Sequence, residues 1–400
     1  MSDKEQYEKQ KLRVYAVVLA SSFSMGLSNP FLGVYAARLG ASPLELGFFH
    51  SFINFSGNIM QVIWGYIADK VRRYKLIVAL SMTVSALMWL LILSTDEPMQ
   101  FVIFVSIQSL FSSAAAPSWM ALLGLLVPVD RMGAVLSRIN QFSTLGSLAA
   151  TMLAGAISQL FRGGIQEFHV PFYLSMFTGV AAALFALTIS QPKIRAARKL
   201  SLSVIRLSAL NRDFKALLAL SSAYGIAMSM AWPLFTEVVG NEMKLGVYEI
   251  SILTIASNVT SLITQNWAGE FVDRYGKKIF IVIGRTSFCL YPIIYGFVPR
   301  FEAILVTNIA LNVISAFLVV ALQAYILKVT PEDVRATYVA LLNMSMGLCF
   351  SLGSLMGGIA ANYLIPIMGR WAAIRLLFVI AAVARFFVGV LHSKLREPGE

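Results

Sequence analysis

The fold is decided by one stretch, Gly65-Tyr-Ile-Ala-Asp69-Lys-Val-Arg-Arg-Tyr-Lys75, which joins two long apolar runs. A second copy, Gly269-Glu-Phe-Val-Asp273-Arg-Tyr-Gly-Lys-Lys278, starts 204 residues later. Each copy has a Gly, an Asp four residues on, and then a cluster of cations. We expect each to be a turn in water that ends one helix and begins the next. The Gly would permit close helix approach, and the Asp would accept N–H groups at a helix N-terminus.

The composition places the rest of the chain in a membrane. Of the 400 residues, 58% are hydrophobic and only 13% are charged, whereas soluble domains carry about 25% charged residues. Apolar runs of about 18 residues or more recur along the chain, which predicts an all-α polytopic membrane protein. The two cysteines, Cys289 and Cys349, fall inside such runs and are expected to be inert.

Twelve membrane spans can be read from the apolar runs. They cover residues 14–37, 45–67, 75–95, 100–127, 137–161, 171–190, 214–238, 248–268, 279–298, 303–327, 336–362 and 372–391. The longest connection, 191–213, is basic and separates six spans from six. We therefore predict an N-terminal six-helix bundle (1–190), a cytoplasmic linker (191–213) and a C-terminal six-helix bundle (214–400).

The distribution of positive charge predicts the orientation. If the N-terminus is cytoplasmic, 24 of the 32 Lys and Arg residues fall in inside segments and 6 in outside loops. Cytoplasmic loops carry such an excess, so both termini are expected in the cytoplasm. The bias also accounts for the net charge of +12, so no nucleic-acid partner is predicted.

The two halves are related beyond the turns. Asn54 and Asn258, and likewise Gln61 and Gln265, are 204 residues apart, and Pro30 and Pro233 are 203 apart. The small-residue stretches that start at Gly146 and Cys349 also align at 203. These matches indicate a tandem duplication, with two parallel repeats related by an axis along the membrane normal.

The paired turns resemble the loop signature of the major facilitator superfamily, Gly-x-x-x-Asp-Arg/Lys-x-Gly-Arg/Lys-Arg/Lys. The second copy matches fully, whereas in the first Arg72 stands where the family prefers Gly. The resemblance implies two pseudo-symmetric six-helix bundles, with helices 3, 6, 9 and 12 outside a central cavity. It implies that the turns control closure on the cytoplasmic side, with Asp69 against the start of span 11, around Arg335–Tyr338. The gating residues would be Gly65, Asp69, Lys70, Arg73, Gly269, Asp273, Arg274, Gly276 and Lys277.

Side-chain amides are the candidates for the solute path, because a bare amide that faces lipid costs free energy. Spans 3, 6, 9 and 12 contain no Asn or Gln. Asn54, Asn58, Gln61 and Gly65 have the spacing of one helix face, and each amide could also be interhelical glue. With three aromatic residues as candidate walls, the predicted path is Asn29, Asn54, Asn58, Gln61, Gln108, Trp119, Asn140, Tyr224, Trp232, Asn258, Gln265, Asn312, Gln323 and Asn343.

Prolines and ionisable residues mark further positions inside the spans. Pro117 and Pro233 are candidates for helix breaks. His50 and Glu237, near outer ends, are the candidate proton-binding residues, although a structural role for His50 is the stronger interpretation. Arg285 and Arg385 lie in spans 9 and 12, where we expect them to extend toward an interface.

These patterns favour a secondary transporter that moves a small neutral or amphiphilic organic solute by alternating access, with protons as a candidate coupling ion. Two alternatives stay open: a proton-driven multidrug efflux antiporter, and a non-transporting membrane receptor or scaffold. Related drug exporters carry an Arg at the position of Gln108 and a Pro that span 5 lacks. Nucleotide-binding, nucleophile and metal-ligand motifs are missing, so we expect no enzymatic activity, no cofactor and no metal. The protein should be a plasma-membrane monomer.

Overall fold

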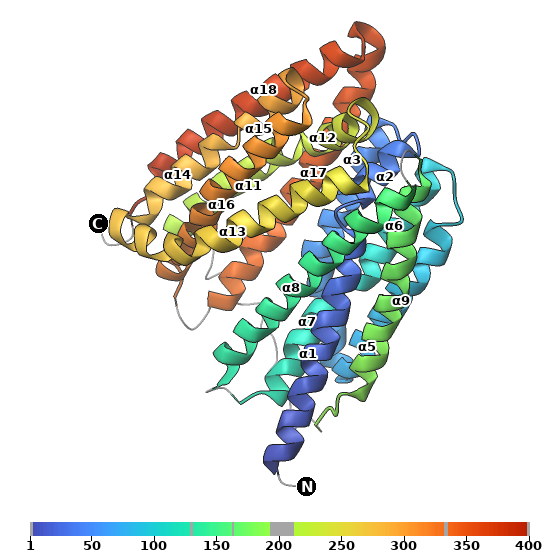
Figure 1. Cartoon of the computed structure of the whole chain (residues 1–400). Coiled ribbons are helices and arrows are strands. Elements are labelled where there is room, and N and C mark those ends of the chain that lie inside the picture. Colours follow the sequence, from blue (N-terminus) through green and yellow to red (C-terminus); the bar gives the residue numbers. More distant parts are fainter. Residues whose placement is uncertain (1–2, 129–130, 162–163, 193–211, 332–334, 398–400) are drawn as a thin grey trace. The chain divides into compact units, whose positions relative to one another are not determined.

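The computed structural model describes residues 3–128, 131–161, 164–192, 212–331 and 335–397, and these residues form helices joined by turns, without a strand among them (Figure 1). The all-α prediction is therefore confirmed. Most of the predicted linker lies outside the described residues. Both signature turns end one helix and begin the next, as predicted: α4 (Gln61–Val71) gives way to α5 (Tyr74–Ile92), and α13 (Val247–Tyr275) to α14 (Lys277–Ser287).

Eleven helices among the described residues are long and apolar enough to cross a membrane. The predicted second span is not one of them, although it is helical throughout. There α3 (Pro43–Phe55), a π-helical turn (Ser56–Met60) and α4 follow one another without a gap. This run contains a histidine and three side-chain amides, which make it more polar than the other spans. The twelve predicted spans thus correspond to eleven apolar helices and one polar helix.

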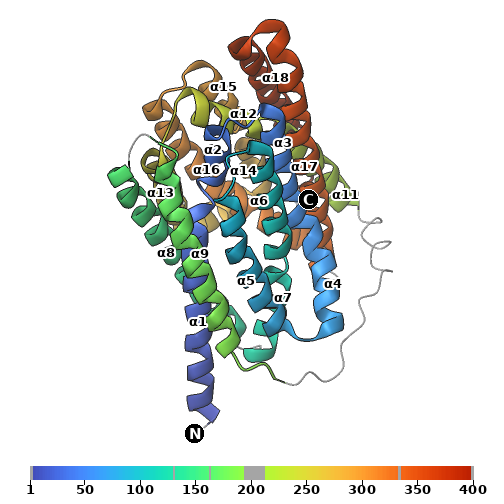
Figure 2. The same cartoon turned by 90° about the vertical axis from the view of Figure 1, so that its right-hand side faces the viewer.

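The chain divides into two compact units. Unit 1 comprises 1–40, 59–198 and 245–252. Besides α4 and α5, its helices are α1 (Asp3–Ser28), α2 (Leu32–Arg38), α6 (Pro98–Ser112), α7 (Ala115–Leu126), α8 (Met132–Ser158) and α9 (Gln166–Thr188). Within it, α1 lies beside α8 and α9, while α5 packs against α6, α7 and α9 (Figure 2). Its core gathers buried Val17, Val78 and Leu122.

Unit 2 comprises 41–58, 199–244 and 253–400. Its helices are α3, α11 (Arg212–Ser229), α12 (Trp232–Glu237), most of α13, α14, α15 (Leu290–Phe297), α16 (Phe301–Val329), α17 (Arg335–Met368) and α18 (Arg370–Leu391). A second π-helical turn, Val238–Glu242, extends α12. The core of unit 2 gathers buried Phe214, Ile281 and Tyr325.

The units do not coincide with the two sequence repeats. Segment 41–58 comes from the first repeat but packs within unit 2, against α17 and α12. Segment 245–252 comes from the second repeat but belongs to unit 1. Each repeat thus contributes the N-terminal part of one helix to the other compact unit. The prediction that 1–190 and 214–400 are the two functional bundles stays a prediction.

Several spans are broken where the sequence places a proline. Span 4 breaks between α6 and α7, just before Pro117, and span 7 between α11 and α12, just before Pro233. Span 1 breaks at the repeat-equivalent place, between α1 and α2 at Pro30. Proline lacks an N–H and its ring clashes with the carbonyl four residues back, so it interrupts the helical hydrogen bonds. The predicted breaks at Pro117 and Pro233 are confirmed.

Candidate functional site

The two signature turns place different residues at the equivalent position, both with positive φ but with different ψ. Gly276 has a φ of 89°, and the equivalent Arg72 has a φ of 57° as the residue that ends α4. Glycine adopts this left-handed region without steric cost, whereas a residue with a Cβ does not. The departure of the first copy from the family pattern therefore places a residue with a Cβ in the left-handed conformation that ends α4.

Replacement of that residue gives a first prediction. Arg72→Gly should raise the free energy of unfolding by about 0.5–1 kcal/mol, because the left-handed conformation no longer costs free energy. The measurement is the thermal unfolding midpoint in detergent. Lys70→Gly is the matched control, since Lys70 lies in the last turn of α4 and glycine weakens a helix interior. A midpoint for Arg72→Gly at or below that of the wild type would contradict the prediction.

Side chains from the ends of the repeats cap the helices that follow the turns. The Lys75 N–H donates to Gln191 Oε1 (2.9 Å), and Gln191 Nε2 donates to the Arg72 carbonyl (2.7 Å). In the second repeat, the N–H groups of Lys277 and Lys278 donate to the two carboxylate oxygens of Glu397 (2.9 and 3.0 Å). The helices that follow the turns are thus capped by acceptors beyond the sixth and twelfth spans and not by the signature Asp residues.

The signature residues have local partners in this structure. Tyr74 OH donates to Asp69 Oδ1 at 2.9 Å, and the exposed Asp273 lies 3.8 Å from Lys277 Nζ. Lys70, Arg73 and Arg274 are exposed, whereas Lys277 is buried. A Cβ on Gly65 would meet only Pro117 at an ordinary 3.7 Å, and a Cβ on Gly269 would meet nothing within 4 Å. The close helix approach predicted at these glycines is not made here.

A polar ladder runs along the N-terminal half of span 2, and we define it as His50, Asn54 and Asn58. Asn54 Nδ2 donates to the His50 carbonyl (2.8 Å), and Asn58 Nδ2 donates to the Asn54 carbonyl (2.9 Å). All three side chains are half-buried. Because each amide uses one N–H on a carbonyl one turn back, its oxygen and its second N–H are the groups that remain for another partner.

Residues of α12 and α17 surround this ladder within unit 2. His50 Nε2 lies 2.9 Å from Thr236 Oγ1, and the Trp232 ring lies 6.2 Å from the imidazole and 5.0 Å from the Phe350 ring. Gly347 admits Asn58, since a Cβ there would overlap the Asn58 side chain. The ladder thus combines two amides, an imidazole and two aromatic faces, which can bind a solute through hydrogen bonds and stacking.

The sequence predicts one polar helix face from Asn54 to Gly65, but the helix is not regular over that length. Its spacing assumed an α-helix of 3.6 residues per turn, but Ser56–Met60 is a π-helical turn. Gln61 and Gly65 follow that turn, so the sequence spacing no longer aligns them with Asn54. Single π turns in helices frequently occur at functional sites.

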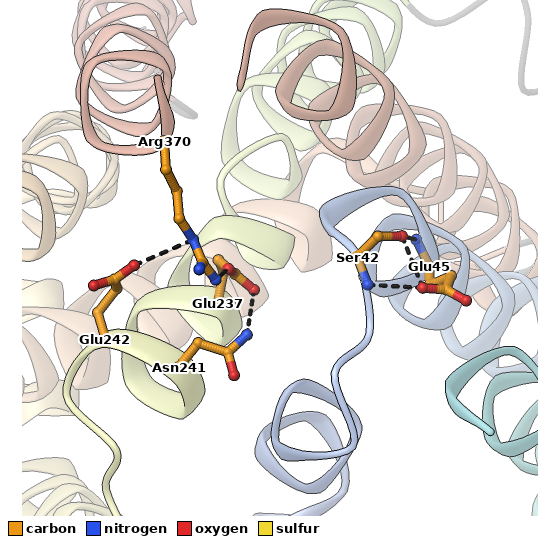
Figure 3. A network of polar contacts seen from close by, with 6 residues as sticks. All are labelled: Ser42, Glu45, Glu237, Asn241, Glu242 and Arg370. Atoms are coloured by element: carbon orange, nitrogen blue, oxygen red, sulfur yellow. Dashed lines mark hydrogen bonds and ion pairs between the residues drawn. The ribbon is translucent and has the colours of Figure 1, made fainter. Parts of the chain in front are cut away.

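A charged network lies at the C-terminal end of span 7 (Figure 3). Glu237, with 1% of its surface exposed, pairs with Arg370 Nη2 and accepts a hydrogen bond from Asn241 Nδ2 (2.8 Å). Arg370 Nε also lies 3.1 Å from Glu242 Oε1. Glu237, predicted as a proton-binding candidate, is therefore a buried carboxylate with one arginine and one amide as partners. Thr236, its neighbour in sequence, connects it to the polar ladder.

Unit 1 holds a counterpart of this ion pair with the charges exchanged. Arg38, at the end of span 1, lies 3.8 Å from the buried Glu167 at the start of span 6. Glu167 and Arg370 are 203 residues apart, so they are equivalent in the repeat. Each repeat therefore joins its first and sixth helices by an ion pair, with the acid on opposite partners.

Small residues create two further equivalent contacts. In unit 1, a Cβ on Gly155 would lie 2.8 Å from Ser251 Cβ, and in unit 2 a Cβ on Gly358 would lie 2.6 Å from the Pro43 carbonyl oxygen. Gly155 and Gly358 are 203 residues apart and belong to the aligned small-residue stretches. These stretches permit the starts of spans 8 and 2 to lie close against spans 5 and 11.

The other predicted path residues are spread through both units. Gln108 donates to the Ser85 carbonyl of α5 (2.7 Å), which fits the interhelical-glue interpretation, and Trp119 packs on the core of unit 1. Asn312 donates to the Asn308 carbonyl (2.8 Å). Gln61 and Asn258 are half-buried, and the exposed residues are Asn29, Asn140, Gln265, Gln323 and Asn343. Tyr224 is fully buried and donates to the Arg285 carbonyl (2.8 Å), so its ring does not line an open cavity in this structure.

The expectation that Arg285 and Arg385 extend to an interface was wrong. Arg385 has 1% of its surface exposed and Arg285 has 5%. The Arg285 guanidinium lies over the Tyr224 ring at 4.2 Å, and Arg385 donates to three backbone carbonyls.

An apolar cavity of about 450 Å³ at Leu44 and Asn362 contains none of the predicted path residues.

The family model of the Major Facilitator Superfamily matches residues 14–221 and again 217–400. The chain belongs to this superfamily. The two matches confirm the duplication and identify a membrane transporter with the superfamily's two-repeat fold.

Individual superfamily members differ in their similarity to this one. An uncharacterised MFS-type transporter of Methanocaldococcus jannaschii is 21% identical over 96% of this chain and 97% of its own. Multidrug resistance protein 1 of Bacillus subtilis is 26% identical over 41% and 40% of the two chains. Among solved structures, a point mutant of the nucleoside transporter NupG gives a TM-score of 0.81 at 17% identity, over 96% of this chain and 100% of that one. That likeness shows the superfamily fold.

Several residues of the site in this superfamily member were not predicted from the sequence. Thr236, Phe350, Arg370, Gln191 and Glu397 all make contacts that depend on residues distant in sequence. The repeat offset offered one signal, because Glu167 and Arg370 align at the starts of spans 6 and 12. No comparable signal marked the ring contact of Phe350.

Proposed function

We propose that the protein is a secondary transporter that moves a small neutral or amphiphilic organic solute by alternating access, and that the polar ladder of span 2 forms part of its binding site. The observation that carries the proposal is the ladder itself, which lies beside the Trp232 and Phe350 rings. The helix that holds it is too polar to face lipid along this side. Polar groups inside membrane helices are costly and usually functional.

Amide and aromatic groups favour a solute with hydrogen-bonding edges and an apolar face. A nucleoside has both features, and NupG, whose fold is similar, is a nucleoside transporter. Coupling to protons is proposed at Glu237, because a buried carboxylate beside a partly exposed arginine can exchange partners when it binds a proton. The second candidate function, proton-driven drug efflux, draws on the same carboxylate and on the partial similarity to multidrug resistance protein 1.

The test is a thermal-shift screen of the purified protein against nucleosides, sugars and amphiphilic dyes at two pH values, followed by cysteine protection. Cysteines introduced by Asn54→Cys and Asn258→Cys, in a background without Cys289 and Cys349, should react with a thiol reagent. The stabilising solute should slow each reaction about tenfold, as expected for a site mostly occupied by ligand.

A matched control separates protection from a general loss of accessibility. Ser94 is exposed near the outer end of span 3, so Ser94→Cys should react equally with and without solute. If neither Asn54→Cys nor Asn258→Cys ever reacts, the amides are interhelical glue and the path assignment fails. A screen in which no solute stabilises the protein would favour the receptor or scaffold alternative.

Orientation is a further part of the proposal: both termini and the 191–213 segment lie in the cytoplasm of a plasma-membrane monomer. The charge bias supports this, with 24 of 32 cations in the inside segments. Ser201 lies outside the described residues but inside that segment, so Ser201→Cys should resist impermeant reagents in intact cells and react after lysis. Efficient labelling in intact cells would reverse the orientation.

A further inference from the structure

Arg385 is a buried cation whose partners are backbone carbonyls rather than an acid. From α18 it donates through Nε to the Ala227 carbonyl (3.3 Å), through Nη2 to the Met228 carbonyl (2.5 Å) and through Nη1 to the Phe288 carbonyl (3.1 Å). Its guanidinium also lies 5.4 Å from the Phe235 ring. A charge this deeply buried is stable only when its donors are satisfied.

Helix breaks, one of them at a proline, account for the carbonyls that Arg385 binds. An α-helical carbonyl accepts the N–H four residues on, but the position four residues after Phe288 is Pro292, which has no N–H. Ala227 and Met228 lie in the last turn of α11, directly before the break that precedes Pro233. Arg385 thus occupies the C-terminal ends of two half-helices, where the helix dipole favours a positive charge.

The break in span 7 determines where α12 points. α12 carries Trp232, whose ring lies near His50 and Phe350, and Thr236, which meets His50 Nε2. The break and these contacts all lie within unit 2. A change in the geometry at Ala227–Ala231 would therefore displace the α12 side of the polar ladder.

We infer that Arg385 is a positioning residue: it holds the ends of the broken helices of spans 7 and 9, and thereby aims Trp232 and Thr236 at the polar ladder. Its role in solute binding rests on the proposed function, whereas its effect on geometry does not. The first repeat handles its equivalent break with hydroxyl groups instead, since Ser175 of α9 donates to the Ser24 carbonyl of α1 at 2.9 Å.

Disulfide cross-linking measures that geometry directly. In a background with Cys289→Ala and Cys349→Ala, one pair of cysteines is introduced by His50→Cys and Thr236→Cys, above the break. A second pair, by Ser222→Cys and Ser345→Cys, joins α11 to α17 below it, where the two hydroxyls lie 2.7 Å apart. Each pair is combined with Arg385→Met and, as the matched control, with Arg285→Met. Arg285 is equally buried but lies over a tyrosine ring.

We expect Arg385→Met to slow cross-linking of the upper pair about tenfold, which corresponds to ~1.4 kcal/mol, and to leave the lower pair unchanged. Arg285→Met should leave the upper pair near the wild-type rate. Equal slowing of both pairs, or no slowing of the upper pair, would overturn the inference, because a merely structural role loosens the whole unit. Should Arg385→Met fail to yield folded protein, Arg385→Lys, which keeps the charge but not the three-way geometry, must show intermediate slowing.

Binding of uridine and of rhodamine 6G, with His50 intact, distinguishes the two proposals. If Arg385→Met slows the upper pair and weakens binding of either probe, both proposals are supported. If it slows the upper pair while a probe that binds the wild type binds equally well, Arg385 positions α12 but the ladder is not the solute site. If neither probe binds the wild type, the cross-linking rates alone decide the inference.

Discussion

Arg370→Ala should lower the free energy of unfolding by about 1–3 kcal/mol, between the values for an exposed and a buried ion pair, because only the acid of this pair is buried. The reason is that the carboxyl group of Glu237, with 1% of its surface exposed, would lose its cation and keep only the hydrogen bond from Asn241. Arg370 itself is more exposed and also contacts Glu242, so Glu237→Gln should cost less. The measurement is denaturant unfolding of the purified protein in micelles.

The double variant makes this expectation specific. Glu237→Gln combined with Arg370→Ala removes both charges and keeps the Asn241 contact, so it should recover most of the lost stability. Arg300→Ala, at an exposed outer-loop arginine, is the control and should change stability by less than about 0.5 kcal/mol. If Arg370→Ala is as harmless as Arg300→Ala, Glu237 is uncharged in the folded protein and its pair with Arg370 contributes nothing.

Asp69→Asn should shift the balance of conformations about tenfold away from the state closed on the cytoplasmic side, a change of ~1.4 kcal/mol. The family resemblance implies that the Asp69 carboxylate then lies against the start of α17, around Arg335–Tyr338, where helix N–H groups favour a negative charge. Spin labels across the cytoplasmic mouth would report the change as longer distances.

Tyr74→Phe is the matched control for this experiment. It removes the tyrosine hydroxyl that donates to Asp69 at 2.9 Å, but keeps the carboxylate. If the gate depends on the charge, Asp69→Asn changes the distance distribution and Tyr74→Phe does not. If Tyr74→Phe reproduces the change, the local turn is responsible; and an unaltered distribution with normal transport for Asp69→Asn would make the turn a simple connector.

The fold could be predicted because its signals are local and repeated. The apolar runs, the turns at Asp69 and Asp273, and the breaks at Pro117 and Pro233 each follow from a few adjacent residues. Duplication then repeated several of these signals, so that the turn at Asp69 gained a partner 204 residues on and Pro30 gained Pro233. The second span is the exception. Its helix was predicted correctly, but its π turn was not, because nothing in the sequence Ser56–Met60 distinguishes hydrogen bonds between residues five apart from those between residues four apart.

The site could be predicted only in part, because its contacts join distant segments. Composition singled out Asn54 and Asn58 as polar groups in an apolar run, yet their neighbours Thr236 and Phe350 follow from how α12 and α17 pack. The caps supplied by Gln191 and Glu397 lie more than a hundred residues from the helices they satisfy. Arg385 was misjudged because a lone arginine in a span suggests a surface, and only the two helix breaks beside it explain its burial.

The exchanged charges of the two outer ion pairs have a consequence for how the protein is made. A duplicated chain enters the membrane with two sets of similar helices, and repeat proteins are prone to pair the wrong copies. If span 6 joined span 7, Glu167 would meet Glu237; if span 12 joined span 1, Arg370 would meet Arg38. Both errors place like charges together, and only the correct partners place opposite charges together. The two ion pairs thus favour association of span 6 with span 1 and of span 12 with span 7 while the chain is still being assembled.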